Sequence, residues 1–595
     1  MTSISNLEPP EKIRIHVPLA VALNSKGQPD REEQFVWFRK DKGMKGERIR
    51  KLFNGRDELE VVESPDAEGW TKVKIGKEEG FIMSRLTDKK TGKVYPTFEK
   101  TDPELAAPPQ PRTATPSVLR VASKEGTPVA VPAVKTGAQV LVDTNFAALE
   151  ALAKELGRPV RIGLIANQTT MIRNPQTGAM EHLADFMAKN PNPNVRLVAL
   201  YGPEHGIRGT AAAGAEVKGG VDVSTGLPVH SLYGKTKKPT PEMLKDVDAM
   251  VFDVQDVGLR YYTYVATMAL AMQAALEKKD SAFAKGMPFM VLGRANPMGG
   301  DYVAGHVAEP GNQSFVSQLA IPTAHGMTVD ELAKMFVKEP MLFQKGSDTP
   351  QSLKGLNLSV VPMEGWKRNM HWRDTGLSWI PTSPNLPGDE ERQAYAATAS
   401  FLENTDVNTG RGLKRGQFTV AGAPWIKSEK EAQALANKLN AVGLKGVEFE
   451  RVAYTPREID GMAPDPIHQD KLVRGVKLKV TDAKAFDPLR TNAHILKAFF
   501  DARPKDMPVN TPDEKGYGFF KLNEGDWTRL MAGKTTVKDK LVKGESADAI
   551  AGSWKTEVEQ FKKIRERYLN PDYAAAAEDP AATRKKALTP APGGG

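Results

Sequence analysis

Cysteine is absent from the 595 residues of this chain. Its absence excludes disulfide bonds, catalysis by a thiolate and zinc held by cysteine. Long hydrophobic runs are missing too, because no stretch approaches the roughly 20 consecutive apolar residues that a membrane span needs. The N-terminus, MTSISNLEPPEKIRIH, has neither an apolar core nor a cleavage site. We therefore predict no secretory (Sec) signal and no membrane span.

Several familiar catalytic and cofactor motifs are absent as well. The sequence has no HExxH or His-x-His metal pattern, no GxGxxG nucleotide fingerprint and no GxSxG serine motif. We therefore predict no metal and no cofactor. The net charge of +9 permits an anionic partner. Because the basic residues are mixed with acids and do not alternate with aromatics, we do not expect nucleic acid as that partner.

The length predicts a multidomain α/β protein, and local composition places its parts. Residues 1–100 alternate short β-prone runs with turn signals, which predicts a small all-β barrel. The proline-rich residues 101–137 are typical of an extended linker. Residues 138–389 form the predicted Rossmann-like α/β domain and 390–572 a smaller α+β domain. The alanine- and proline-rich residues 573–595 are predicted to be a disordered tail.

The α/β region carries four continuous apolar runs, and a polar cluster follows each one. The runs are VRIGLIA, RLVAL, AMVFDV and PFMVL, and segments with helical spacing of apolar residues lie between them. Continuous rather than alternating runs suit strands that helices cover on both faces. Strand, polar cluster and helix, repeated four times, predict a doubly wound sheet. Ligands bind such sheets beyond the carboxyl ends of the strands.

The most informative cluster is YGPEHGIR, residues 201–208. Gly202, Pro203 and Gly206 frame Glu204 and fix its backbone in a tight turn. A carboxyl group at a sheet edge can serve as a general acid when its surroundings raise its pKa. The alternative is an acid that caps the helix after the strand.

Charged residues of the other clusters allow two interpretations. Asp253 lies within an apolar run and needs a partner, which Arg260 or Arg294 can supply. Arg208, Arg260 and Arg294 can instead bind an anionic substrate group through paired N–H donors. The residues alone leave open which arginines bind substrate and which form internal ion pairs.

A series of motifs resembles one known family. The motifs, in chain order, are GLIANQT, YGPEHGIRG, DVSTGLPVHSLYG, MVFDVQDVGLRYYTY, GRANPMGG, IPTAHGMT, TGLSWIPTSPNLP, NTGRG and GAPW. Over residues 141–569 they resemble the exo-β-N-acetylmuramidase (NamZ) family. Gly293 and Ala295 depart from the acid and the proline that the family usually has there. The resemblance implies a Rossmann-like domain with the site, a smaller C-terminal domain that closes over it, and release of N-acetylmuramic acid (MurNAc) from non-reducing ends of peptidoglycan fragments.

The resemblance also implies roles for individual residues. The implied catalytic residues are Glu204, as the acid, with His205, Asp253 and Asp256. The implied substrate-binding residues are Asn167, Gln168, Arg208, Gln255, Arg260, Tyr262, Tyr264, Arg294, Asn296, His325, Asn385 and Arg411. An arginine in this pocket would meet the lactyl carboxylate of MurNAc. The second catalytic group is left open between Asp253, Asp256 and the substrate's own acetamido group.

The N-terminal region resembles bacterial SH3-like modules. The matching residues are Gly69, Trp70, Lys72, Val73, Gly80, Phe81 and Ile82. Because both regions point to the cell wall, we predict a peptidoglycan glycoside hydrolase with peptidoglycan or muropeptide glycans as its partners. An endo-acting muramidase and a non-catalytic wall-binding protein are the alternatives.

The predicted substrate places the site of action in the periplasm or the cell wall. Since we find no Sec signal, the chain is expected to be cytoplasmic before export. One version of this hypothesis is an antibacterial effector, which would have an immunity protein as a further partner.

Overall fold

The computed structural model describes residues 134–574 apart from gaps at 190–191, 213, 280–285, 312, 345–346, 403–404, 511–517 and 521–535. Before residue 134 it describes the backbone of nine strands. The chain divides into two compact units, Met1–Lys124 and Glu125–Gly595. No helix in the described part is long and apolar enough to cross a membrane.

The described backbone of the N-terminal unit forms antiparallel strands. They are β1 (Glu11–Ile15), β2 (Phe35–Arg39), β3 (Arg48–Phe53), β4 (Glu58–Glu63), β5 (Trp70–Ile75), β6 (Glu78–Met83), β7 (Arg85–Thr87), β8 (Val94–Pro96) and β9 (Phe98–Lys100). Seven pair in the order β3-β2-β6-β5-β4-β1-β9, and β7 pairs with β8. The SH3-like prediction rests on side chains that lie outside the described residues, so it stays a prediction.

A mostly parallel sheet organises the second unit, as predicted. Its strands are β10 (Val160–Ala166), β13 (Val195–Gly202), β14 (Gly220–Val221), β15 (Pro228–Ser231), β16 (Ala249–Asp253), β17 (Phe289–Leu292) and β20 (Leu358–Val361). The order is β14-β15-β13-β10-β16-β17-β20, and β14 alone runs antiparallel to its neighbour. From β15 to β20 the chain order is 3-2-1-4-5-6, which is that of dinucleotide-binding Rossmann sheets.

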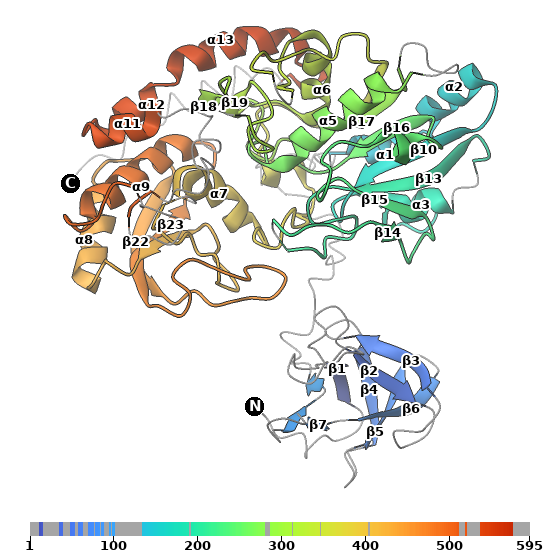
Figure 1. Cartoon of the computed structure of the whole chain (residues 1–595), viewed down its shortest axis with the longest axis horizontal. Helices are drawn as coiled ribbons and strands as arrows, with labels where there is room; N and C mark the ends of the chain where they lie inside the picture. Colours follow the sequence, from blue (N-terminus) through green and yellow to red (C-terminus); the bar gives the residue numbers. More distant parts are fainter. Residues whose placement is uncertain are drawn as a thin grey trace, which may run out of the picture. The chain divides into compact units, whose positions relative to one another are not determined.

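Helices cover both faces of this sheet (Figure 1). On one face lie α1 (Gly137–Asp143), α2 (Ala147–Leu156) and α3 (Leu183–Ala188), and on the other α5 (Thr263–Glu277) and α6 (Val329–Lys338). Alternate residues of β17 reach the two cores, Met290 and Leu292 one and Phe289 and Val291 the other. Both faces are thus apolar, which explains the continuous hydrophobic runs.

Smaller elements surround the sheet. They are the hairpins β11 (Met171–Arg173) with β12 (Met180–His182) and β18 (Ala304–Val307) with β19 (Pro322–Ala324), α4 (Pro241–Leu244) and the 3-10 helix η2 (Trp372–Thr375). The hairpin of β18 and β19 lies after β17 in the chain, and its strands are antiparallel.

The C-terminal part is α+β. Its elements are α7 (Asp389–Leu402), β21 (Val420–Ala423), α8 (Glu429–Asn440), β22 (Val447–Tyr454), β23 (Val473–Val480), α9 (Pro488–Ala502), α11 (Thr536–Val542), α12 (Ala547–Gly552), α13 (Lys555–Arg565), η3 (Glu566–Tyr568) and η4 (Pro571–Tyr573). The antiparallel sheet has the order β21-β23-β22. Helix α13 returns to the Rossmann-like part, where Val307 N donates to Glu557 Oε2 at 2.9 Å.

The described residues include the end of the predicted linker and the beginning of the predicted tail. Tyr573 is fully buried, and its ring packs edge-to-face on Trp366 with centroids 5.1 Å apart. Its hydroxyl oxygen accepts a hydrogen bond from Met363 N at 2.8 Å. Val134 is buried in the same cluster. Val134 and Tyr573 each lie more than 200 positions from Trp366 in the sequence. Their apolar packing in the Trp366 cluster fixes two segments whose local composition is typical of disorder.

Asp248 joins the amino ends of β10 and β16. Its nearly fully buried carboxylate accepts hydrogen bonds from the Arg158 guanidinium at 2.6 and 2.8 Å and from that of Arg161 at 2.9 and 3.1 Å. Burial favours the neutral form, but the bonds from the two arginines outweigh it and hold the pKa of Asp248 well below its ordinary value.

We expect Asp248→Asn to lower the free energy of unfolding by about 1–3 kcal/mol, because both arginines lose a charged acceptor. A depressed carboxyl pKa stabilises the folded state above the unfolded pKa of about 4, and this is lost as the pH falls towards the folded pKa. Urea unfolding should therefore separate wild type and variant at pH 7 and separate them less at pH 2.5. Asp246→Asn is the control, since that side chain is 71% exposed; equal losses in both variants would contradict the assignment.

Candidate active site

The four predicted polar clusters meet at one edge of the parallel sheet. Strands β13, β10, β16 and β17 are neighbours in that order, and the carboxyl end of each strand adjoins or enters its cluster. The reversal of strand order lies between β10 and β16, where open α/β sheets bind their ligands. The topology therefore brings together residues that are more than 100 positions apart in the sequence.

Glu204 is half-buried, and hydrogen bonds hold both oxygens of its carboxyl group. Thr263 Oγ1 donates to Oε2 at 2.7 Å, and Gly214 N donates to Oε1 at 2.9 Å. Thr263 is the first residue of α5, so the carboxyl group lies beside the amino end of that helix. These contacts fix the orientation of the carboxyl group.

The turn after Glu204 is tight. His205 and Gly206 have φ values of 70° and 74°, and a non-glycine residue rarely adopts this left-handed conformation. The His205 ring is buried, and its Nδ1–H donates to Ala211 O at 2.8 Å. The ring thus shapes the loop that brings Gly214 to Glu204. Backbone strain held by such contacts is a frequent feature of functional sites.

Tyr233 and Lys237 lie beside Glu204, and the sequence did not predict them as site residues. Burial and the neighbouring Glu204 carboxyl group raise the pKa of the Tyr233 hydroxyl. Lys237 Nζ lies 3.4 Å from the centroid of the Tyr233 ring and 4.9 Å from that of Phe315. Burial lowers the pKa of Lys237, and Glu204 opposes that shift. The motif with Tyr233 is visible in the sequence, but the return of its loop to Glu204 is not.

Asp253 and Arg294 form a buried ion pair. Arg294 Nε donates to Asp253 Oδ1 at 2.7 Å, and Nη2 donates to Oδ2. The Asp253 side chain is fully buried and that of Arg294 is 6% exposed. Because both carboxylate oxygens are engaged, this geometry argues against a catalytic role for Asp253 and a substrate-binding role for Arg294. Of the two partners that the sequence allowed for Asp253, it is Arg294 that binds it.

Arg208 is also engaged by protein carboxylates. Its Nε and Nη2 donate to Asp222 at 2.9 and 2.7 Å, and its Nη1 and Nη2 donate to Asp185 at 3.0 and 2.7 Å. The hydrogen bonds from Arg208 lower the pKa of Asp222 to about 2. This arrangement ties the loop after β13 to α3 and argues against the predicted contact of Arg208 with substrate.

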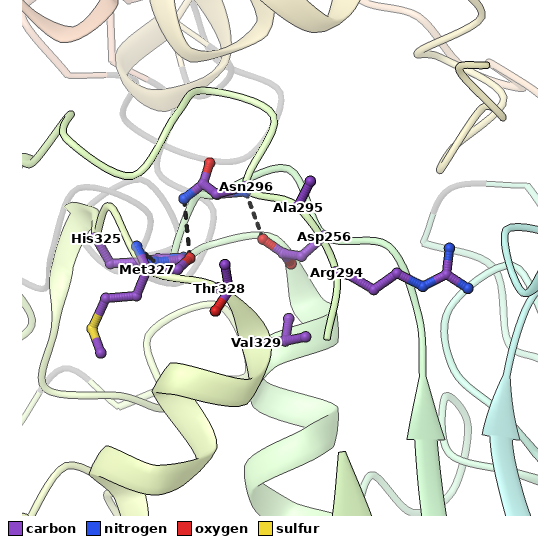
Figure 2. A pocket seen from close by; sticks show the side chains of 9 residues that line it. Asp256, Arg294, Ala295, Asn296, His325, Met327, Thr328 and Val329 are labelled. Carbon is purple, nitrogen blue, oxygen red and sulfur yellow. Dashed lines mark hydrogen bonds between the residues drawn. The ribbon is translucent and has the colours of Figure 1, made fainter. Parts of the chain in front are cut away.

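Asp256 and His325 line a small cavity with a volume of about 10 Å³ (Figure 2). Asp256 Oδ1 accepts a hydrogen bond from Gly258 N at 2.6 Å. Burial raises the pKa of the Asp256 carboxyl to about 7. Burial and the charge of Arg565 lower the pKa of His325 to about 3, so its ring is neutral near pH 7. Within the described residues no group of His, Asp and Glu side chains has the arrangement of a metal site.

Seven of the predicted site residues carry a buried polar atom without a hydrogen-bond partner among the described residues. These atoms are Asn167 Nδ2, Gln168 Oε1, Gln255 Oε1, Asp256 Oδ2, Arg260 Nε and Nη2, His325 Nε2 and Asn385 Oδ1. Buried polar groups are nearly always paired in folded proteins. A set of unpaired donors and acceptors in these loops therefore indicates a site for a ligand rich in hydroxyl or amide groups.

A segment around Thr382 closes against the predicted residues. Tyr262 OH donates to Thr382 Oγ1 and Tyr264 OH donates to Thr382 O, both at 2.7 Å. Gln168 Nε2 donates to Pro381 O at 2.9 Å. The two tyrosine rings meet edge-to-face with centroids 5.0 Å apart. This segment, which precedes α7, thus covers one side of the strand-end loops.

Three predicted amide side chains donate hydrogen bonds to the backbone. Side-chain amide groups donate to carbonyl oxygens in three pairs, Gln255 to Ala295 at 2.8 Å, Asn296 to Met327 at 3.1 Å and Asn385 to Met462 at 2.9 Å. The half-buried Arg411 lies in the loop between α7 and β21, where its carbonyl oxygen accepts from Asn408 Nδ2 at 3.0 Å.

Comparison with known proteins identifies similar sequences. Family models described as exo-β-N-acetylmuramidase NamZ match this chain twice, the N-terminal model over residues 162–390 and the C-terminal model over 394–570. The peptidoglycan β-N-acetylmuramidase NamZ of Bacillus subtilis (strain 168) is 41% identical over 409 residues. That match covers 69% of this chain and 86% of the relative.

Two crystal structures of DUF1343 family proteins from Bacteroides fragilis NCTC 9343 have a similar fold. One is 33% identical to this chain with a TM-score of 0.58, and the match covers 73% of this chain and 98% of the solved chain. The other is 27% identical with a TM-score of 0.53, and the match covers 74% of this chain and 99% of the solved chain. Nearly the whole of each solved chain therefore has a counterpart in this chain.

We expect Asp253→Asn to lower the free energy of unfolding by about 3–5 kcal/mol, because it leaves the Arg294 guanidinium buried without a counter-charge. Asp253→Asn combined with Arg294→Met should recover most of this loss, since both charges are then removed. Thermal unfolding of the two variants and the wild type measures the recovery. If Asp253→Asn alone keeps the wild-type stability but abolishes activity, Asp253 instead has a catalytic role.

The raised pKa of Asp256 predicts a stability that depends on pH. A carboxyl that titrates near 7 in the folded state and near 4 in the unfolded state stabilises the fold fully below about pH 4. That contribution is lost as the pH rises through 7. Asp256→Asn keeps an acceptor for Gly258 N and cannot ionise, so the stability of wild type relative to this variant should fall between pH 4 and pH 7. Parallel urea-unfolding profiles of the two proteins would contradict the burial of a neutral carboxyl group.

Proposed function

This chain belongs to the NamZ family of exo-β-N-acetylmuramidases and is a glycoside hydrolase, and we propose that Glu204 is the acid with which it releases MurNAc from non-reducing ends of peptidoglycan. The observation that carries the proposal is the oriented, half-buried carboxyl group of Glu204 among unpaired polar groups at the carboxyl edge of the sheet. Catalytic groups of α/β folds lie at this edge.

Glu204 is suited to protonate the glycosidic oxygen. Thr263 and Gly214 hold the carboxyl group in one orientation, and the Tyr233 hydroxyl group lies beside it. Protonation of the leaving oxygen is the step that glycosidases assign to their general acid. His205 acts through the shape of the loop, so we propose a positioning role for it and no contact with the reacting atoms.

The ion pair between Asp253 and Arg294 bears on which residue is the second catalytic group. Arg294 binds both carboxylate oxygens of Asp253, which argues against Asp253 as the second catalytic carboxylate. Asp256 Oδ2 has no hydrogen-bond partner among the described residues, and the carboxyl group is neutral below about pH 7. These observations support Asp256, or the acetamido group of the substrate assisted by its surroundings, in the second role.

The unpaired atoms match the groups of an N-acetylated sugar. Donors such as Asn167 Nδ2 suit hydroxyl and acetamido oxygens, and acceptors such as Gln255 Oε1 suit hydroxyl and amide hydrogens. We propose that these side chains, with Gln168, Asn296 and the tyrosines of α5, bind the terminal sugar. A different ligand would leave some of these buried polar groups without hydrogen-bond partners. That cost makes the pocket selective for a sugar that pairs with all of them.

The exo-acting interpretation is favoured over the two alternatives from the sequence. The segment at Thr382 covers one side of the loops around Gln168 and Tyr262, and a site closed on one side suits a chain end better than the middle of a glycan. The intact Glu204 geometry favours an enzyme over a wall-binding protein that has lost turnover.

The cell wall provides the setting for this activity. Because peptidoglycan lies there, we propose that the chain acts in the wall or the periplasm, with an SH3-like module in residues 1–100 holding it on the wall. In the effector version of this proposal, the producing cell requires an immunity protein, and co-purification from that cell would test for one.

We expect Glu204→Gln to lower kcat/KM for a chromogenic β-MurNAc glycoside by about 100-fold or more, because the proton donor is lost. Binding of free MurNAc, measured by calorimetry, should be retained. Glu216→Gln is the matched control, since Glu216 is an exposed carboxylate in the same loop and also faces Lys237.

If Glu204→Gln and Glu216→Gln lower kcat/KM equally, the substitutions act by disturbing the loop and not by removing the proton of Glu204. If the wild type releases nothing from the glycoside but clears a suspension of whole sacculi, the endo-acting alternative holds. If it binds MurNAc and cleaves neither substrate, the wall-binding alternative holds.

A further inference from the structure

Arg208, Arg260 and Arg294 lie in the loops after β13, β16 and β17, and two of them hold a carboxylate with the same edge of the guanidinium group. Arg208 uses Nε and Nη2 for Asp222, and Arg294 uses Nε and Nη2 for Asp253. In Arg260 the same two nitrogens have no partner among the described residues. This edge presents two parallel N–H groups, which match the two oxygens of a carboxylate.

The rest of the Arg260 side chain is fixed. Its Nη1 donates to Ser317 Oγ at 2.6 Å and to Val316 O at 3.3 Å. The residue is 1% exposed. Burial lowers the pKa of its guanidinium to about 10, so the group is still charged at neutral pH. A buried cation without a counter-ion is costly, and removal of that cost by a bound anion would stabilise the complex.

The loops around Arg260 connect it to the proposed catalytic group. Arg260 lies in the segment between Asp256 and Thr263, and Thr263 donates to the Glu204 carboxyl group. On its other side, the Val316 carbonyl that it binds follows Phe315, whose ring centroid lies 5.9 Å from that of Tyr233. Arg260 is therefore held by the same loops that surround Glu204.

We infer that Arg260 binds the carboxylate of the substrate's lactyl group and thereby distinguishes MurNAc from N-acetylglucosamine (GlcNAc). The inference rests on the proposed function and adds the residue that determines its specificity. MurNAc differs from GlcNAc by the lactyl ether, whose carboxylate supplies the missing counter-ion. Arg260 takes no part in breaking the glycosidic bond.

The test compares two substrates that differ by this group. For wild type, Arg260→Met and Arg260→Lys, we would measure kcat/KM for chromogenic β-MurNAc and β-GlcNAc glycosides and the inhibition constants of free MurNAc and GlcNAc. Arg260→Met should reduce the preference for MurNAc by about 10- to 100-fold in both measurements, as expected for a lost hydrogen bond to a charged group. Arg260→Lys should recover only part of it, because an ammonium group lacks the paired donors.

Lys237→Met is the matched control, since Lys237 is a second cation near Glu204, and this variant should keep the wild-type preference. A loss of preference in Lys237→Met with none in Arg260→Met would overturn the inference in favour of Lys237. Equal losses for both sugars in Arg260→Met would make Arg260 structural and overturn it too. If Arg260→Met does not fold, an unchanged preference in Arg260→Lys overturns it. A wild type that releases neither sugar would refute the proposed function instead.

Discussion

The buried ion pair between Asp253 and Arg294 is the interaction on which the rest of the site depends. It joins the last residue of β16 to the loop that follows β17 at the carboxyl edge of the sheet. The Asp253 carbonyl oxygen also accepts from Thr170 Oγ1 at 2.5 Å, which brings in the loop after β10. That loop is bound in turn to the β16 loop, since Gln255 N donates to Thr169 Oγ1 at 3.0 Å. Three strand ends are thus locked by contacts that leave the other side chains free for a ligand.

The locking contacts explain why so many polar atoms can be buried without partners nearby. Each unpaired donor or acceptor costs stability, and a loop held only by such atoms would move until they were satisfied. Here the backbone is fixed by other bonds, such as that from Gln255 N to Thr169 Oγ1, while Gln255 Oε1 has no partner in the described part of the chain. Preorganisation of this kind lets a site bind its ligand without reordering its own groups.

Much of the fold and the position of the candidate site could be predicted from the sequence. The pairing of side chains that are distant in the sequence could not. Continuous apolar runs predicted the parallel sheet because strands covered on both faces leave that pattern, and the topology then determined where the polar clusters meet. The sequence could not assign Arg208 to Asp185 and Asp222, because residue type does not reveal a partner from another loop. Tyr233 and the buried Tyr573 were missed for the same reason: their surroundings come from distant segments.

The arginines show how one residue type serves two purposes at one edge. Arg294 and Arg260 both project from strand-end loops and both are nearly fully buried, so burial does not separate them. What separates them is the counter-charge that the protein itself supplies at the Nε and Nη2 edge. With its carboxylate, Arg294 stabilises the fold whether or not substrate is present. Arg260 has no such carboxylate among the described residues, so its buried charge lowers the stability of the free protein. A cost of this kind is retained at a functional site, where a bound ligand offsets it.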